Sequence, residues 1–277
     1  MIKKKSITRY TRQIFAIVEK DISIELRIKY NLIGRLVNPT IQLFLYFFLL
    51  GVIFNFNTDF KLGYWDSTNF VLFLLLAYSI NFSRSIINKY NISFGRDKYW
   101  KTLSAIMVAP VHRFTLLLGT LAAEMIMISV PLIIILVIAY ILFPISLFYL
   151  FLTLLILFGM FLTFASIGLI IGAFRISHEQ YVNIIMYILR FVFLFSCIFY
   201  PIYIFPEFIQ VIVLINPFYY YFDLLRLTWY MGINYEAASS LITIQHIIIF
   251  ILITTISPIF SLYLFEKIYK KYGITGY

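Results

Sequence analysis

An acid and a base stand three residues apart in the stretch INPFYYYFDLLR, residues 215–226, which is otherwise mostly apolar and aromatic. At this spacing Asp223 and Arg226 share one face of a helix and can form an ion pair. Catalysis would require a further group, such as a nucleophile or a metal ligand, and the neighbouring sequence offers none. We therefore interpret Asp223 and Arg226 as a structural pair that fixes a local helix, rather than as a contact to a ligand.

The other residues that could carry chemistry form no catalytic or metal-binding pattern. The three histidines, His112, His178 and His246, lie far apart and lack the spacing of metal ligands. Cys197 is the single cysteine, which excludes an intrachain disulfide and a cysteine-based metal site. The 11 glycines include no G-x-x-x-x-G-K-[ST] loop for ATP, and the motifs G-x-S-x-G and H-E-x-x-H do not occur. We expect neither a cofactor nor enzymatic activity in this chain.

The composition is that of a membrane protein. Hydrophobic residues make up 62% of the chain and charged residues 12%, whereas soluble domains have about 45–50% apolar and about 25% charged residues. The basic stretch 1–37 is too long for the first part of a signal peptide, and no small-residue cleavage site follows it. We predict an all-α integral membrane protein that keeps its basic N-terminus. We attribute its formal charge of +10 to membrane sidedness rather than to a nucleic-acid partner.

Apolar runs predict six transmembrane helices. A helix needs about 20 mostly apolar residues to cross the hydrocarbon core, and the six runs are about 39–56, 70–87, 113–140, 147–172, 181–200 and 241–265. The uncharged stretch 125–174 would measure about 75 Å as a single helix, so the chain must turn back near Pro144. Residues 38–266 thus form one transmembrane domain between an N-terminal arm, 1–37, and a short tail, 267–277.

The distribution of lysine and arginine orients these helices. Most of the 22 basic residues fall in the N-terminal arm, in the connection between the second and third spans, or in the tail. With six spans these segments share one side, and an excess of positive charge marks the cytoplasmic side. We predict a multi-pass protein of the cytoplasmic membrane, surrounded by membrane lipids, with both termini in the cytoplasm.

The N-terminal arm predicts an amphipathic interfacial helix. Ile14, Val18, Ile22 and Leu26 recur every four residues within 7–37, while charged and polar residues occupy the other side. A basic amphipathic helix that precedes a span lies along the inner leaflet. It serves either as an anchor or as a lever that touches a cytoplasmic partner, and the anchor is the simpler interpretation.

A second cytoplasmic helix is predicted in the connection before the third span. Within residues 97–108, Trp100, Leu103 and Met107 form one apolar stripe, and Pro110 ends the helix. Such a stripe fits either a groove of a partner protein or the headgroup region of the membrane.

Two ionisable residues fall inside predicted spans. Glu124 lies about 11 residues into the third span from its cytoplasmic end, and Arg190 about nine residues into the fifth, so both lie close to the bilayer centre. Charges at this depth are costly and are usually paired or functional. We predict that Glu124 and Arg190 approach each other, within one subunit or across a dimer, as a structural pair rather than a substrate site.

The segment before the last span predicts an external re-entrant or interfacial hairpin. Residues 201–215 are too short, and too interrupted by Pro201 and Pro206, to cross the membrane and return. Asn216 can cap a following helix whose first residue is Pro217. We expect four aromatic side chains of that helix in the outer interfacial belt: Tyr219, Tyr220, Tyr221 and Trp229.

Three stretches resemble the permeases of ATP-binding cassette type-2 exporters. RIKYNLIGRLVNPTIQLFLYFFLLGVIF (27–54) is similar to the family's interfacial helix and first span, WKTLSAIMVAPVHRFTLLLGTLAAE (100–124) to its coupling loop, and FYPIYIFPEFIQVIVLINPFYYYFDLLR (199–226) to its C-terminal signature. The matching residues are Thr102, Leu103, Pro110, Arg113 and Gly119 in the second stretch, and Pro201, Pro206, Asn216, Pro217, Asp223 and Arg226 in the third. The chain departs from the family beside the coupling loop, where members often carry acidic residues: here Lys98 and Lys101 flank the motif, and Ser104 follows Leu103.

The resemblance implies a half-transporter without an ATP site of its own. Two permease copies as a homodimer, or this permease with a sister permease, would form the pathway and recruit two cytoplasmic ATPase subunits that bind ATP and Mg²⁺. Closure of the ATPase pair would push on the coupling helix, about 97–108, and on the interfacial helix. The central cleft would then switch from inward-facing to outward-facing, with the stretch 201–226 as an external gate.

The same motifs bear on the substrate. The loop APVHR and the block NPFYYYFDLLR resemble the drug-resistance and multidrug branch, which implies export of an amphipathic or lipophilic drug or lipid. RIKYNLIG also resembles the branch that exports lipid-linked polysaccharides or teichoic acids, which is the alternative. An alternative of another class is a secondary transporter driven by an ion gradient through groups such as Glu124.

Overall fold

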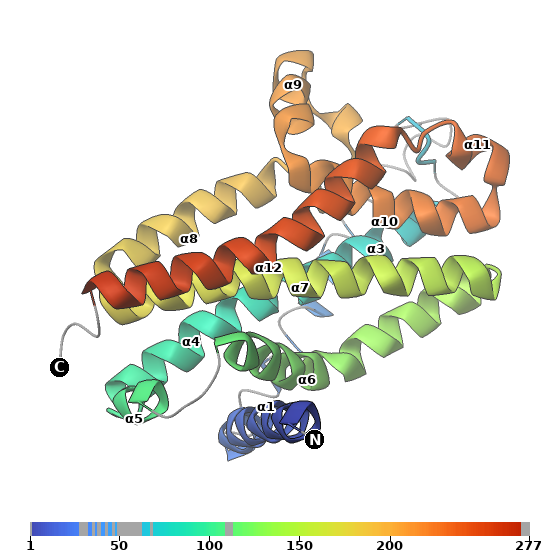
Figure 1. Ribbon diagram of the computed structural model, residues 1–277. Coiled ribbons are helices and arrows are strands. Elements are labelled where there is room, and N and C mark those ends of the chain that lie inside the picture. The colour runs from blue at the N-terminus through green and yellow to red at the C-terminus, as the bar shows by residue number, and fades with distance from the viewer. Residues whose placement is uncertain are drawn as a thin grey trace.

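The computed structural model describes residues 2–27, 63–66, 69–108 and 113–272, together with a few residues between 33 and 48. All regular elements in these ranges are helices (Figure 1). In chain order they are α1 (Ile2–Arg27), α3 (Phe70–Ser83), α4 (Ser85–Tyr99), α5 (Leu103–Val108), α6 (Arg113–Leu142), α7 (Leu147–Ser177), α8 (Glu179–Leu194), η1 (Ile202–Ile204), α9 (Glu207–Ile215), α10 (Pro217–Ile233), α11 (Tyr235–Ser239) and α12 (Ile244–Tyr272). The first predicted span, about 39–56, lies largely outside the described residues.

Four of the described helices are long and apolar enough to cross a membrane. They are α6, α7, α12 and the continuous helix Phe70–Tyr99, which consists of α3 and α4. A fifth crossing exists if α9 and α10, which meet at an angle of 90°, count as one broken span. The chain is therefore an all-helical, multi-pass membrane protein.

Helices α6 and α7 begin at residues 113 and 147, where the third and fourth spans were predicted to begin. The chain turns between them at residues 143–146, around Pro144. Both helices continue a few residues past their predicted ends. Helix α12 likewise extends to Tyr272, beyond the predicted sixth span of 241–265.

The helix that contains the second predicted span, 70–87, is longer than that span. The helix continues through α4 to Tyr99, where a loop was predicted. Its buried side chains recur at helical spacing and face the protein: Lys89, Tyr90, Ser93, Phe94 and Asp97. The polar members of this stripe give the segment the composition of a loop, although they are satisfied by partners on other helices.

The helix at the fifth predicted span, 181–200, ends earlier than predicted. Helix α8 ends at Leu194, and Cys197 in the following turn has a φ of 56°. The 16 residues of α8 extend about 24 Å, less than the hydrocarbon core of about 30 Å. The turn leads the chain into η1 and α9, and the 90° bend before α10 has the geometry of either a re-entrant segment or a broken span.

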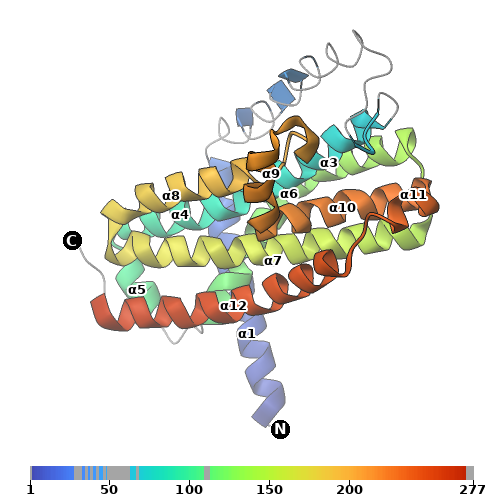
Figure 2. The same ribbon diagram turned by 90° about the horizontal axis from the view of Figure 1, so that it is seen from above.

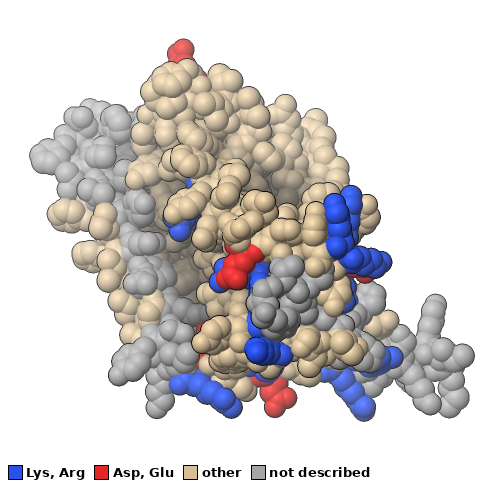
Figure 3. Space-filling model, turned by 90° about the vertical axis from the view of Figure 1, so that its left-hand side faces the viewer, with Lys and Arg blue, Asp and Glu red and all other residues tan. Residues whose placement is uncertain are grey.

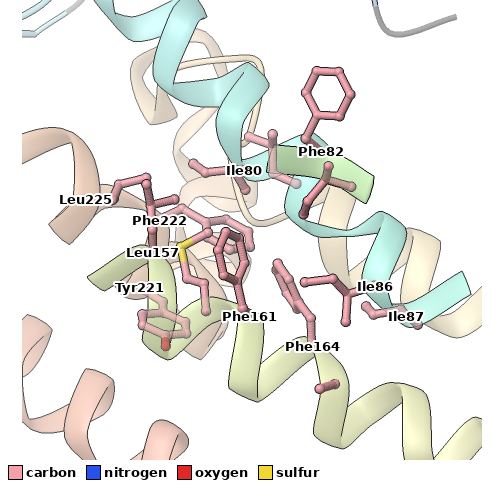
Figure 4. Close-up of a cluster of buried hydrophobic side chains, with 14 of the residues drawn as sticks. Ile80, Phe82, Ile86, Ile87, Leu157, Phe161, Phe164, Tyr221, Phe222 and Leu225 are labelled. Atoms are coloured by element: carbon pink, nitrogen blue, oxygen red, sulfur yellow. The ribbon is translucent and has the colours of Figure 1, made fainter. Parts of the chain in front are cut away.

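Helix α7 runs through the middle of the bundle, in contact with α4, α6, α8, α10 and α12 (Figure 1). Figure 4 shows Leu157, Phe161 and Phe164 of α7 between side chains of the α3–α4 helix and of α10. All three are buried. The apolar core of the described chain is therefore built around this helix.

Small residues on α7 let α4 approach closely. Gly168 faces the ring of Tyr90, and a Cβ added to this glycine would lie 2.6 Å from Tyr90 Cδ2. Gly172 faces the ring of Phe94 in the same manner, one turn further along. Helices in membranes commonly associate through such small residues, because lipid tails are as apolar as the side chains and offer no hydrophobic gain.

The ends of α4, α6, α8 and α12 meet at one end of the bundle. Lys98 Nζ, near the end of α4, lies 3.5 Å from the carboxylate of Glu179 at the start of α8. The guanidinium of Arg113, at the start of α6, lies 5.0 Å from the ring centroid of Tyr269 in α12. Figure 3 looks onto this end, where most of the visible charged side chains gather in the lower half. We call it the basic end.

Helix α1 crosses the bundle near the basic end (Figure 2). Ile17 packs on Gly119 of α6, whose added Cβ would lie 2.8 Å from Ile17 Cβ. The side of α1 that faces the protein also buries Asp21 and Glu25, whereas Leu26 of the predicted apolar stripe is exposed. Ile14, Val18 and Ile22 are half-buried, so the stripe borders the face that α1 packs against the rest of the chain.

We expect Gly168→Ala to destabilise the protein, because the added Cβ overlaps the Tyr90 ring. Overpacking of this kind costs about 1–3 kcal/mol, of which alanine recovers up to about 1 kcal/mol through its higher helix propensity. Gly34→Ala is the matched control, because nothing lies within 4 Å of a Cβ added there. Thermal unfolding in detergent, followed by circular dichroism, should give a lower Tm for Gly168→Ala alone. Equal Tm values for the two variants would contradict the close contact.

Candidate functional site

A sharp corner joins α4 to α5 at the basic end. Helix α4 ends at Tyr99, and Lys101 takes a left-handed conformation with a φ of 57°. The N–H and the hydroxyl of Thr102 both donate to the backbone carbonyl of Asp97, at 3.0 and 3.2 Å. These bonds satisfy a carbonyl that the end of the helix leaves without an intrahelical partner. The coupling helix predicted over 97–108 is therefore divided, and α5 covers only Leu103–Val108.

The corner exposes aromatic side chains, but the predicted stripe is only partly correct. Tyr99 is 84% exposed and Trp100 is 53% exposed, with the guanidinium of Arg96 beside the Trp100 ring. Leu103 is completely buried, contrary to its predicted place on the exposed stripe. It packs α5 onto the core.

The other predicted coupling residues are less closely grouped. Lys101 and Thr102 are exposed at the corner itself. Arg113 begins α6 and lies over aromatic rings of α12. The Met107 side chain and Pro110 lie outside the described part of the chain.

Ion pairs fasten α1 to the end of α4 beside this corner. Lys20 Nζ lies 2.6 Å from the Asp97 carboxylate, and Arg96 Nη2 lies 3.0 Å from the Asp21 carboxylate. Asp21 is completely buried and also accepts a hydrogen bond of 3.2 Å from the Ser93 hydroxyl. The corner and α1 are therefore held together as one unit.

A third pair lies deeper. Lys89 Nζ is 2.8 Å from Glu25 Oε1, and the two side chains are only 1% and 7% exposed. The sequence analysis did not identify these pairs. Residue spacing could have indicated them. Asp21 and Glu25 lie four residues apart, and Lys89 and Arg96 lie seven apart, so each set shares one face of its helix.

A groove of about 370 Å³ lies between α1, α4, α5 and α6. Its walls are mainly apolar and include Ile17, Phe94 and Ile106, and the ion-paired Lys20 and Asp97 also line it. The surface at the basic end thus combines an apolar depression with a fixed pair of charges.

Glu124 and Arg190 are not joined within the described chain. Glu124 is buried and accepts a hydrogen bond of 2.9 Å from the Ser85 hydroxyl. Arg190 is exposed, with its guanidinium 5.1 Å from the ring centroid of Tyr187. Ser85 and Arg190 line the same cavity, so the two charged residues belong to one region. Pairing across a dimer stays a prediction.

At the opposite end of the bundle, Asp223 joins three distant segments. It accepts a hydrogen bond of 2.7 Å from the Tyr64 hydroxyl, and its other oxygen lies 3.5 Å from His246 Nε2 in α12. Burial, and then the nearby Asp223 carboxylate, raise the pKa of Tyr64 well above its ordinary value. The phenol therefore stays protonated and donates to Asp223. We call Tyr64, Asp223, Arg226 and His246 the outer cluster.

Arg226 does not form the predicted ion pair with Asp223 within 4 Å, and both residues are buried. Arg226 Nη2 donates to the backbone carbonyl of Cys197 at 2.9 Å and to that of Ile198, in the turn that follows α8. Carbonyls beyond a helix end lack intrahelical donors, and within a membrane the protein must supply them. Local sequence could not reveal this role, because the carbonyls lie 29 and 28 residues away.

Asn216 holds the same turn from the other side of the bend. Its side-chain oxygen accepts a hydrogen bond of 3.1 Å from the Phe218 N–H, with Pro217 first in α10, which confirms the predicted cap. Its amide nitrogen donates to the Val192 carbonyl at 2.7 Å, near the end of α8. Pro201 and Pro206 stand immediately before η1 and α9, the two short helices between these points.

Two aromatic residues predicted in the outer belt are inside the protein instead. Tyr221 and Trp229 are completely buried. The Tyr221 hydroxyl lies 2.9 Å from Thr254 Oγ1, and the Trp229 indole N–H donates to the Phe143 carbonyl at 3.2 Å. Tyr219 and Tyr220 are half-buried. Helix α10 is therefore a packed element of the bundle.

The α4–α5 corner and the outer cluster lie apart in the bundle but are built in the same way. Each joins helices that are distant in sequence through charged or polar side chains with defined partners. The part of the chain that the structure describes holds no group of three His, Cys, Asp or Glu side chains placed to bind a metal ion. Within the described residues, these side chains join helices to one another.

We expect Lys89→Met to destabilise the contact between α1 and α4 by about 3–5 kcal/mol, because Glu25 would keep a buried charge without its cation. The double variant Lys89→Met/Glu25→Leu removes both charges and should recover most of that loss. The measurement is thermal unfolding together with the rate of proteolysis within α1. A double variant no more stable than Lys89→Met would contradict the pairing.

Tyr64→Phe should destabilise the outer cluster by about 1.5–3 kcal/mol, because a hydrogen bond to a buried carboxylate is lost. Tyr203→Phe is the control, since Tyr203 packs beside the Tyr64 ring and its hydroxyl has no hydrogen bond among the described residues. Chemical or thermal unfolding of the two variants compares them directly. An equal effect of both substitutions would show that the hydroxyl of Tyr64 is not the stabilising group.

One family of known proteins matches most of this chain. The family model described as ABC-2 type transporter matches residues 12–230, well over half of the chain, and the match includes both the α4–α5 corner and Arg226 of the outer cluster. Comparison with curated proteins gives no match. The chain belongs to the ABC-2 type transporter family and is the membrane-embedded permease component of an ABC transporter.

Proposed function

We propose that the chain is the permease subunit of an ATP-driven exporter that moves an amphipathic or lipophilic substrate, drug-like or lipid, out across the cytoplasmic membrane. Six helices span the membrane in each copy, and both termini lie in the cytoplasm. Two copies form the pathway as a homodimer. Two separate ATPase subunits bind ATP and Mg²⁺ and dock at the basic end.

The α4–α5 corner is the observation that carries this proposal. Two aromatic side chains, Tyr99 and Trp100, project there from the end of a 30-residue helix. Exposed aromatic residues of this kind are the usual anchors in a partner's groove. Leu103 is buried, so α5 cannot move independently of the core beneath it.

The corner is connected to the far side of the membrane by a single helix. Phe70–Tyr99 extends about 45 Å at 1.5 Å per residue. Near its other end, the ring of Phe73 lies 4.1 Å from the Arg226 guanidinium of the outer cluster. A displacement imposed on the corner by an ATPase is therefore carried to the outer cluster, which acts as the external gate.

The two branches of the family that the sequence resembles differ in the class of substrate that they export. Inside-out vesicles that contain the permease and its ATPase are expected to accumulate a lipophilic dye when ATP is added. Accumulation of a lipid-linked glycan alone would support the polysaccharide and teichoic-acid alternative. Accumulation driven by an ion gradient without ATP would contradict the ATP-driven mechanism.

We expect Trp100→Ala to weaken both co-purification with the ATPase and the stimulation of ATP hydrolysis by substrate. Loss of one anchoring aromatic side chain costs about 2 kcal/mol or more, which corresponds to about thirtyfold in affinity. Tyr235→Ala is the matched control, because Tyr235 is a similarly exposed aromatic residue, 62%, on α11 at the other end. Unchanged binding and hydrolysis for Trp100→Ala would show that the corner is not the docking site.

A further inference from the structure

Asp223 of the outer cluster is contacted by donors from two distant parts of the chain. Its carboxylate accepts a hydrogen bond of 2.7 Å from the Tyr64 hydroxyl. Its other oxygen lies 3.5 Å from Nε2 of His246, whereas an N–H···O hydrogen bond measures about 2.7–3.2 Å. Nε2 is buried and has no hydrogen-bond partner in the part of the chain that the structure describes. The hydrogen bond to Tyr64 is therefore formed, and that to His246 is not.

The start of α12 determines which nitrogen of the His246 ring carries the proton. The backbone N–H of Thr243 donates to Nδ1 at 3.2 Å, and the Thr243 hydroxyl lies 2.7 Å from the same nitrogen. A backbone N–H can only donate, so Nδ1 is an acceptor without a proton. The neutral ring then carries its proton on Nε2. The nitrogen closest to Asp223 is therefore a donor.

This donor needs only a small movement to reach its acceptor. A buried N–H without an acceptor destabilises the conformation that leaves it unsatisfied. A movement of about 0.3–0.8 Å would bring Nε2 of His246 within hydrogen-bond distance of Asp223. Helices that switch between two packed arrangements commonly shift by about 1–2 Å. A second conformation in which α12 lies slightly closer to α10 therefore satisfies both groups.

Tyr64 is fastened to the start of the α3–α4 helix. The Asn69 side chain donates to the Tyr64 carbonyl at 2.9 Å and accepts the Asp66 N–H at 2.9 Å. The N–H of Phe70, the first residue of α3, donates to the Asp66 carbonyl at 3.0 Å. Tyr64 therefore moves with the helix that leads to the α4–α5 corner.

His246 is held by α10 and α12 instead. Its ring lies edge-on to that of Tyr220 in α10, with the centroids 5.2 Å apart, and Thr243 fixes it at the start of α12. A displacement of the α3–α4 helix that withdraws Tyr64 thus leaves His246 beside Asp223. Asp223 is buried, and a buried carboxylate needs a donor whichever way the helices are placed.

We propose that His246 is a positioning residue of the external gate and the second partner of Asp223. When the ATPase displaces the α3–α4 helix and Tyr64 leaves, the Nε2–H of His246 donates to Asp223 in its place. Helix α10 then stays fastened to α12 while the α3–α4 helix moves. The inference deepens the proposed function, on which it rests, because it names the residue that satisfies Asp223 in the second state of the gate.

The test observes the His246 ring directly. The full chain, labelled with ¹⁵N-histidine, is studied by NMR in phosphatidylcholine nanodiscs at neutral pH. The sequence has three histidines, and the signals that disappear in His246→Asn are those of His246. Asparagine keeps an acceptor near the position of Nδ1, so the contact with Thr243 is preserved. We expect a bare Nδ1 and a protonated Nε2, and a proton on Nδ1 would overturn the proposal.

Tyr64→Phe removes the first partner of Asp223 and keeps the aromatic ring. We expect the Nε2 proton of His246 to shift downfield in this variant, because it forms a hydrogen bond to the free carboxylate. Tyr203→Phe is the matched control, since Tyr203 packs against the Tyr64 ring, and the His246 signal should stay in place. An unchanged signal in Tyr64→Phe, or an equal shift in both variants, would overturn His246 as the second partner.

A second measurement needs no substitution. The wild-type chain is assembled with its ATPase and a non-hydrolysable ATP analogue, and co-purification checks that the complex has formed. The Nε2 proton should shift in the same direction as in Tyr64→Phe. If Tyr64→Phe does not fold, this measurement decides, and an unchanged signal overturns the proposal. A shift in Tyr64→Phe without one in the complex supports the exchange of partners and contradicts the ATP-driven gate, so the two proposals fail separately.

Discussion

Close contact between α4 and α7 is the constraint on which the rest of the structure depends. Two glycines of α7 receive the rings of Tyr90 and Phe94, so the helix axes approach more closely than larger side chains would allow. This position lets the Tyr90 hydroxyl reach the Leu117 carbonyl of α6. It also leaves the bases Lys89 and Arg96 directed at α1. A contact made of small residues thereby determines where the charged ones meet.

Backbone carbonyls at interrupted helices impose a second constraint. The hydrocarbon core offers no water, so a helix that stops there needs donors from elsewhere in the protein. After α8 these donors are the guanidinium of Arg226 and the amide of Asn216. At the corner after α4 the donor is Thr102, which is adjacent in sequence. The interruption after α8 therefore draws on tertiary contacts, whereas the one at the basic end is satisfied locally.

The sequence predicted what depends on local composition. Helices α6 and α7 follow from long uncharged runs around Pro144, and the Asn216 cap from an Asn-Pro pair. Features that depend on distant partners were missed or misread. The polar sequence of α4 is typical of a loop, and its bases Lys89 and Arg96 have their acidic partners on α1. No residue type near Cys197 indicates that α8 ends before it. One helix was predicted over 97–108, so the corner at Lys101 was missed, and the burial of Leu103 depends on the core beneath it.

The outer cluster also has a consequence for the order in which the chain is assembled. Asp223 receives a hydrogen bond from Tyr64, which is 159 positions earlier, and its contact with His246 comes from the last helix. Synthesis proceeds from the N-terminus, so Tyr64 is in place early and His246 arrives last. Until α12 has entered the membrane, the Asp223 carboxylate lacks one of its partners. This small polar contact therefore forms only after α12 has entered the membrane.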